Sequence, residues 1–159
     1  QDQQGRVVGY AWRVVDDKLI TEDNPRYRFP GDRERNGTML EFRKSLFLYN
    51  GHRMQKPVSD LIVVEGFTPL WWLDQHGLTD VVATMGADCS EAQAELIVTL
   101  TQEEGRVWLA SDGDKAGRQH AQTVLTLVSP HRFVRWVKLD EGQQPTDLSP
   151  EEMRDRFRF

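Results

Sequence analysis

The sequence predicts an α/β protein with a parallel sheet, and two observations support this fold class. Between residues 58 and 140, apolar β-branched runs alternate with segments of helical periodicity in the order β-α-β-α-β-α-β. The connections are of ordinary length, so right-handed crossovers would assemble the strands into one parallel sheet. Acidic residues follow two of these strands directly, where open α/β sheets hold their ligands.

The first part of the chain, residues 1–57, is predicted to be a small β-rich unit. Residues 6–15 are extended in pattern, residues 16–18 form a hairpin turn, and residues 26–29 alternate as a short strand. Residues 42–49 fit either a helix or a strand. Lys56-Pro57 is the predicted exit from this unit.

The second part, residues 58–140, is predicted to contain four strands and three helices. The strands are expected over residues 61–64, 80–84, 107–110 and 133–137. Thr68 with Pro69 begins the first helix, which Gly77 ends. A capping box of Ser90 and Gln93 starts a helix to about Glu104, and the third helix covers residues 115–128. Residues 141–159 are expected to be a loop and a short helix beginning at Ser149.

Composition excludes several classes of protein. A single cysteine, Cys89, rules out an internal disulfide and a cysteine-rich zinc site and favours a reducing, cytoplasmic setting. No apolar run approaches the roughly 18 residues of a membrane span, and no signal-peptide pattern opens the chain. The four histidines, His52, His76, His120 and His131, show no metal-ligand spacing, and most are expected at the surface.

Charge is unevenly distributed along the chain. The net charge is −5, yet residues 1–58 carry 11 Lys and Arg against 8 Asp and Glu, whereas the remainder is acidic. This distribution suits a protein that holds a polyanion on its first part and a metal on its second. A solvated surface of mixed charge is the alternative.

Three acidic residues are the candidate metal ligands. Asp112 and Asp114 follow a predicted buried strand, and two carboxylates at close range repel by about 1 kcal/mol even in bulk water. A site that keeps both ionised implies a cation, and hard oxygen ligands suit Mg²⁺ or Mn²⁺. Glu65 ends another strand 47 residues earlier, and a shared sheet edge would bring it alongside. The alternatives are a plain strand-to-helix turn at Asp112 and a surface carboxylate at Glu65.

These motifs resemble a known domain family. Residues 61–67 with their Glu-Gly pair, a strand ending near Met85-Gly86, and the Asp-x-Asp motif of residues 112–118 are similar to a TOPRIM domain. TOPRIM is a parallel-sheet, Rossmann-like fold shared by bacterial primases, topoisomerases and some nucleases. The resemblance covers about residues 58–140.

Motifs in the first part of the chain extend the resemblance from the TOPRIM domain to one group of proteins that contain it. Residues 5–10, 25–27 and 42–50 are similar to the segment before TOPRIM in the catalytic core of bacterial replicative primases, the DnaG type. The resemblance implies that Arg26 and Lys44 contact template or nucleotide phosphates. The interleaved aromatic residues Tyr27, Phe42 and Tyr49 would also suit base stacking on a single strand, with core packing as the alternative.

The implied function is Mg²⁺-dependent nucleotidyl transfer in DNA replication, as RNA primer synthesis on a single-stranded DNA template from nucleoside triphosphates. Asp112 and Asp114 would bind the metal, and Glu65 would bind it or act as general base. Lys115 and Arg118 would steady phosphate at the start of the helix that follows.

The chain departs from the primase pattern at three positions. Pro69, Gln144 and Thr146 stand where the pattern has acids, so one metal site is implied and the second is left open. A metal-dependent nuclease or nicking enzyme, and a non-catalytic nucleotide- or nucleic-acid-binding module of a larger replication protein, remain alternatives. The primase zinc ribbon and helicase-docking bundle are not in this sequence. A helicase or other replication proteins are therefore expected partners through further domains, and a membrane is not.

Overall fold

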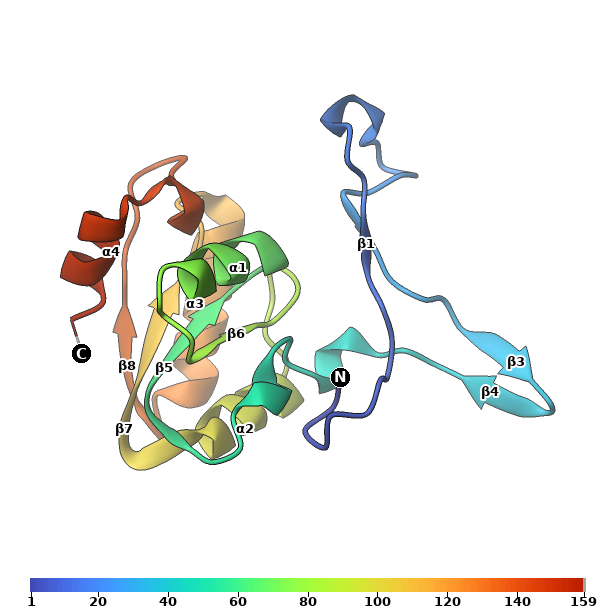
Figure 1. The fold of residues 1–159 in the computed structure, drawn as a ribbon, viewed down its shortest axis with the longest axis horizontal. Coiled ribbons are helices and arrows are strands. Elements are labelled where there is room, and N and C mark those ends of the chain that lie inside the picture. Colours follow the sequence, from blue (N-terminus) through green and yellow to red (C-terminus); the bar gives the residue numbers. More distant parts are fainter. Residues whose placement is uncertain (159) are drawn as a thin grey trace.

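A four-stranded parallel sheet forms the centre of the computed structural model, which describes residues 1–158 (Figure 1). Its strands are β5 (Val58–Val64), β6 (Val81–Ala83), β7 (Thr101–Ala110) and β8 (Phe133–Trp136). Their order across the sheet is β6-β5-β7-β8, and each neighbouring pair is parallel. The predicted α/β class with a parallel sheet is confirmed.

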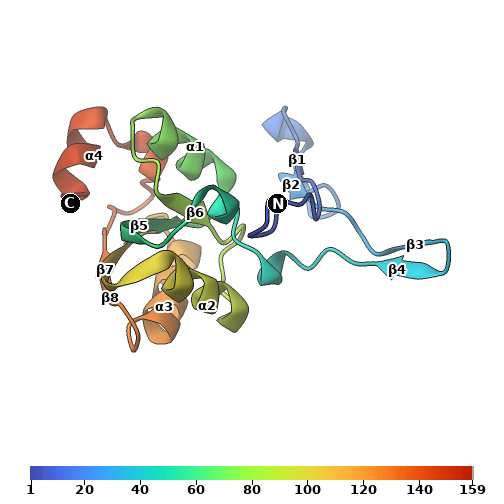
Figure 2. The same ribbon diagram turned by 60° about the horizontal axis from the view of Figure 1, so that its bottom comes forward.

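Side chains of β5 alternate between two hydrophobic layers. Leu61 and Val63 pack with the helices α2 (Glu91–Leu100) and α3 (Lys115–Val128) on one face of the sheet. Ile62 and Val64 pack on the other face, against α1 (Phe67–Gln75) and α4 (Pro150–Arg156). Figure 2 shows the sheet between these two pairs of helices. A strand buried on both faces explains the continuous β-branched run in the sequence.

Side chains of polar residues set where most of the helices begin. The predicted capping box at Ser90 and Gln93 is present at the start of α2, and Ser149 forms another with Glu152 at the start of α4. Asp114 caps α3, which covers the predicted residues 115–128. Leu148, Met153 and Phe157 are buried against the α1 side of the sheet, so the last helix belongs to the same core.

Two predicted helix boundaries are wrong. The second helix ends at Leu100 rather than near Glu104, and β7 begins at once with Thr101. Gly105 lies within β7, where the pairing with β5 shifts register and an added Cβ would lie 2.9 Å from the Ser59 carbonyl oxygen. The glycine therefore permits close strand approach instead of ending a helix. The first helix begins at Phe67 after Gly66, and the Thr68 hydroxyl makes a tertiary contact instead of a cap.

The first part of the chain extends away from the α/β domain and contains two small antiparallel sheets (Figure 1). β1 (Trp12–Arg13) pairs with β2 (Tyr27–Arg28), and a 3-10 helix over Asp17–Leu19 replaces the predicted hairpin turn. β3 (Arg33–Arg35) and β4 (Thr38–Leu40) form a hairpin whose turn residues both have positive φ. Asn-Gly suits this turn, because both residues tolerate positive φ.

Residues 42–49 are neither the helix nor the strand that the pattern allowed. A short 3-10 helix covers Lys44–Leu46, and Tyr49 then forms an antiparallel bridge with Ala83, the last residue of β6. This bridge joins the first part of the chain to the edge of the sheet. Among the helices of residues 1–158, none has the length and apolar character needed to cross a membrane.

Candidate metal and nucleic-acid site

Glu65 and Asp112 lie together at the carboxyl edge of the sheet. Glu65 follows β5 and Asp112 comes shortly after β7, and the two strands pair with Val64 opposite Ala110. The backbone N–H of Asp112 donates a hydrogen bond of 2.9 Å to Oε1 of Glu65. The sheet thus brings together two of the predicted ligands that are far apart in sequence.

Both carboxyl groups have raised pKa values. Burial raises the pKa of Glu65 to about 7; the charges of Asp112 and Asp114 add to the rise, and the Asp112 N–H opposes it. Burial raises the pKa of Asp112 to about 6, and the charges of Asp114 and Asp147 add to it. Each carboxyl group is therefore costly to ionise here, and a cation would favour the ionised forms of both.

Asp114 has a different contact. Its Oδ1 accepts a 2.7 Å hydrogen bond from the Gly117 N–H, which caps α3. Within residues 1–158, no three acidic, histidine or cysteine side chains form a group placed to hold a metal ion. The structure therefore brings Glu65 and Asp112 together, and the role of Asp114 as a third ligand stays a prediction.

One atom of the pair fits a cation. Oδ1 of Asp112 is buried and has no hydrogen-bond partner among the described residues. Buried polar atoms almost always have a partner, and a lone carboxylate oxygen is a suitable ligand for a hard divalent ion. The donor set of Asp112 with Glu65 thus fits Mg²⁺ or Mn²⁺.

A cavity of about 320 Å³ adjoins this pair and reaches the first part of the chain. Glu65, Asp112 and Gln144 line it together with Arg26 and Tyr27. The Tyr27 hydroxyl lies 2.8 Å from the Thr68 hydroxyl of α1, and this hydrogen bond holds the segment against the α/β domain. The Arg26 guanidinium also lies 3.6 Å from the Asp17 carboxylate. A basic residue and two carboxylates that line one cavity suit a phosphate bound together with a divalent cation.

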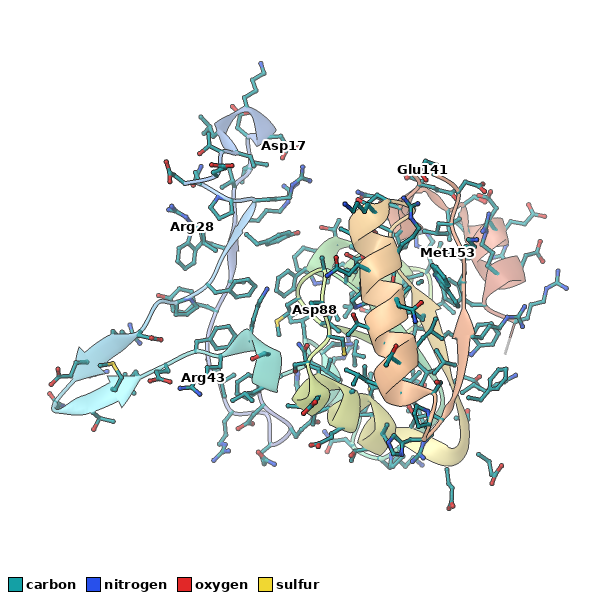
Figure 3. All side chains as sticks on the ribbon, turned by 180° about the vertical axis from the view of Figure 1, so that it is seen from behind. Asp17, Arg28, Arg43, Asp88, Glu141 and Met153 are labelled. Carbon is teal, nitrogen blue, oxygen red and sulfur yellow. The ribbon has the colours of Figure 1, made fainter. Side chains whose placement is uncertain are left out.

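The other three predicted basic residues lie outside that cavity. Lys44 donates a 3.1 Å hydrogen bond from Nζ to the Met85 carbonyl and lies over the Phe29 ring. Arg118 pairs with Glu141 at 2.8 Å near the start of α3, where Figure 3 labels Glu141. Lys115 is exposed on the same helix. Only Arg26 of the predicted phosphate contacts shares a cavity with the carboxylates.

Glycines allow the Asp112 loop its close contacts. A Cβ on Gly117 would collide with the carbonyl oxygen of Asp112, and one on Gly113 would collide with the carbonyl oxygen of Asp140. The Gly113 N–H also donates to the Gln143 carbonyl at 2.7 Å. Both positions need glycine because the backbone of another segment occupies the space of a side chain.

Sequence reasoning missed a buried polar group beside the site. His120 is completely buried and is an exception to the expectation that most of the histidines lie at the surface. It hydrogen-bonds Ser111 and Thr84, which precede the loops at the ends of β7 and β6. The available signal was periodicity, because residues 117, 120, 121, 124 and 128 share the buried face of α3.

Fold and site together define a class of protein. The chain belongs to the Toprim-like family, whose model matches residues 62–149. The curated relatives that it matches are DNA primases. The primase of Pseudomonas aeruginosa is 28% identical over 162 aligned positions, which cover 99% of this chain and 23% of that protein. The chain thus spans about a quarter of that relative's length.

Solved primase structures share the whole described fold. The crystal structure of the Aquifex aeolicus primase, with its zinc-binding and RNA polymerase domains, has a TM-score of 0.78 and 28% identity, covering 98% of this chain and 38% of that one. A DnaG primase catalytic domain bound to single-stranded DNA has a TM-score of 0.76 and 28% identity, covering 98% of this chain and 48% of that one. The predicted resemblance to the primase catalytic core is confirmed.

Proposed function

We propose that this chain performs Mg²⁺-dependent nucleotidyl transfer on nucleic acid, as primase-like synthesis of an RNA primer on a single-stranded DNA template. The observation that carries the proposal is the Glu65–Asp112 pair, with one unpartnered buried oxygen, in a cavity that Arg26 also lines. Its relatives are DNA primases, and one related catalytic domain binds single-stranded DNA.

The carboxylates of Glu65 and Asp112 at the sheet edge are the proposed metal ligands. In this proposal Asp112 and Glu65 hold the divalent ion, and Asp114 joins them if its side chain turns from the helix terminus. A bound Mg²⁺ supplies charge neutralisation to a triphosphate during phosphoryl transfer. Oε1 of Glu65 accepts the Asp112 N–H, so Oε2 is the atom that either contacts the ion or, where Asp112 holds the ion without it, takes a proton from an attacking hydroxyl.

The first part of the chain, residues 1–57, supplies the nucleic-acid contacts in the proposed division of the chain. Arg26 binds phosphate in the cavity, and Tyr27 and Phe29 on its wall offer aromatic faces to a base. Lys44 holds the loop at Met85 and Gly86 that forms another part of the wall. Residues 58–140 carry the metal site, and the described part of the C-terminal segment, residues 141–158, completes the core and contributes Gln144 to the cavity.

Two of the predicted phosphate contacts, Lys115 and Arg118, lie outside the cavity. We assign Lys115 and Arg118 to the phosphate backbone of a strand that passes the start of α3. Arg118 would exchange Glu141 for phosphate in that role. An exposed ion pair contributes little to stability, so this exchange is inexpensive.

A nucleotide- or nucleic-acid-binding module is the second candidate. Pro69 and Gln144 line the cavity at positions where the primase pattern has acids, which reduces the number of available metal ligands. Such a module would bind nucleotide in the presence of Mg²⁺ without turnover.

The deciding experiment measures incorporation of a radiolabelled nucleoside triphosphate on single-stranded DNA, with Mg²⁺ or Mn²⁺ added. A parallel reaction contains labelled DNA and metal but no nucleotide. Primer synthesis that is lost in Asp112→Asn supports the proposal. Cleavage of DNA without nucleotide would instead identify a nuclease, and metal-dependent nucleotide binding without product would identify the binding module.

A further inference from the structure

A chain of buried side-chain hydrogen bonds connects the loops after β6 and β7. Nδ1 of His120 lies 2.7 Å from the Ser111 hydroxyl, and Nε2 lies 3.0 Å from the Thr84 hydroxyl. Thr84 in turn donates to the Gly86 carbonyl at 3.1 Å. The exposed fraction is 0% for His120, 1% for Ser111 and 2% for Thr84, so these groups satisfy one another away from solvent.

The available protons fix which group donates and which accepts in each of these hydrogen bonds. The one hydroxyl proton of Thr84 goes to the Gly86 carbonyl, so Nε2 of His120 must be the donor to Thr84. Burial lowers the pKa of His120 to about 4, although the charge of Asp88 opposes this, so the ring is neutral at pH 7. Nδ1 of a neutral ring that is protonated at Nε2 can only accept, and the Ser111 hydroxyl therefore donates to it.

Both ends of this series of hydrogen bonds lie next to the candidate metal site. Ser111 directly precedes Asp112 in the sequence. At the other end, the Gly86 N–H donates a 3.0 Å hydrogen bond to the Glu65 carbonyl. One of these loops carries Asp112 and the other contacts the backbone of Glu65, and the two are connected through one imidazole ring on α3.

The loop after β6 is held from a second side as well. Gln93, which is 2% exposed, donates from Nε2 to the Thr84 carbonyl at 2.8 Å and to the Phe47 carbonyl at 2.9 Å. Because the loop after β6 is already held in place, its connection to Ser111 through His120 also holds the loop that carries Asp112 in place.

We propose that His120 is a positioning residue that holds the ends of β6 and β7 at the spacing at which Glu65 and Asp112 share a divalent cation. His120 acts through Ser111 and Thr84 and contacts no substrate. The inference rests on the proposed function to the extent that the pair binds a cation.

The first test reads the hydrogen-bond chain directly in the wild-type protein. Nuclear magnetic resonance of the full chain with ¹⁵N-labelled histidine, at neutral pH and without metal, reports which ring nitrogen is protonated. We expect the imidazole of His120 to be neutral, with its proton on Nε2 and no proton on Nδ1. A buried histidine that is doubly protonated, or protonated on Nδ1, would overturn the proposal.

The second test measures Mn²⁺ binding with Mn²⁺ alone as the probe. His120→Leu fills the space without hydrogen bonds and is expected to weaken Mn²⁺ binding about tenfold or more, as loss of a group that orients ligands does. His120→Gln, whose side-chain amide can replace the donor at Nε2, is expected to restore part of the loss. His131→Leu, a change at an exposed histidine, is the matched control and should bind as the wild type does.

A folded His120→Leu variant that binds Mn²⁺ as tightly as the wild type refutes the positioning role. If that variant does not fold, Ser111→Ala replaces it, because it removes only the donor to Nδ1; unchanged Mn²⁺ binding there has the same meaning. A wild-type chain that fails to bind Mn²⁺ refutes the proposed metal site itself. A wrong tautomer in a chain that binds Mn²⁺ refutes the His120 assignment alone.

Discussion

The backbone N–H of Asp112 donates to the Oε1 atom of Glu65 over 2.9 Å, although 47 residues separate the two in sequence. The bond joins the ends of β5 and β7, which are neighbours in the parallel sheet. One oxygen of Glu65 is thus occupied by the main chain, and the other remains for chemistry. The relationship also means that a substitution at Glu65 tests charge cleanly only if it keeps an acceptor for that N–H.

Glu65→Gln keeps the acceptor and removes the charge. We expect the fold to persist, since the amide oxygen can still accept from Asp112 and a repulsive pair is lost. Mn²⁺ binding and nucleotide incorporation should fall by about 100-fold or more, because metal-assisted charge stabilisation contributes several kcal/mol. Titration calorimetry with Mn²⁺ and the incorporation assay measure the two effects.

Glu103→Gln is the control for this change. Glu103 is an exposed carboxylate in the first half of β7, far along the strand from Asp112. It should leave Mn²⁺ binding and incorporation unchanged. Equal losses in the two variants would show that net charge, and not the site, is responsible.

The pH dependence of stability follows from the raised pKa of Glu65. Between about 4.5 and about 7 the folded chain keeps a proton that the unfolded chain has lost, so folded molecules bind more protons in this window. The free energy of unfolding therefore falls as pH rises through it, by at most about 1.4 kcal/mol per pH unit from this group.

Denaturant unfolding of wild type and Glu65→Gln in the presence of a chelator measures this contribution. The wild type should lose stability relative to the variant as pH rises from about 4.5 to 7, and Mg²⁺ added above that window should restore it. A difference between the two proteins that stays constant with pH would contradict the raised pKa.

Gly117→Ala tests the close contact beneath the Asp112 loop. In most helix interiors this change stabilises by about 1 kcal/mol, but here the added Cβ would collide with the Asp112 carbonyl. We expect a loss of about 2 kcal/mol in the free energy of unfolding, together with weaker Mn²⁺ binding. Gly31→Ala, where an added Cβ meets nothing within 4 Å, should have little effect on either measurement.

Arg26→Ala tests whether the cavity binds phosphate. We expect weaker binding of single-stranded DNA and a salt dependence reduced by about one counterion, because a single phosphate contact is removed. Arg28→Ala is the matched control, since Arg28 is exposed on the same segment, apart from the α/β domain (Figure 3). Fluorescence anisotropy over a range of salt concentrations measures both. Identical effects of the two substitutions would point to general electrostatic attraction instead of a site.

Two predictions that rested on local signals are confirmed. The capping box at Ser90 and the limits of α3 are set by nearby side chains, and both are present. One prediction that depended on an unseen pairing partner is wrong: at Gly105, the neighbouring Ser59 carbonyl explains a glycine that looks like a helix end. The burial of His120 could have been predicted from the periodicity of α3, but its hydrogen bonds could not, because its partners Ser111 and Thr84 lie on other elements.

By itself, the sequence determined the order of strands and helices and which acids would stand at strand ends, since periodicity and capping are properties of short segments. Only the tertiary structure decided which of those acids meet. Strand pairing placed Asp112 against Glu65. An oxygen of Asp114 instead accepts a hydrogen bond from the backbone at the start of α3. Hydrogen bonds between distant elements have a direction and a length that no local pattern contains, which is why the His120 chain appeared only in three dimensions.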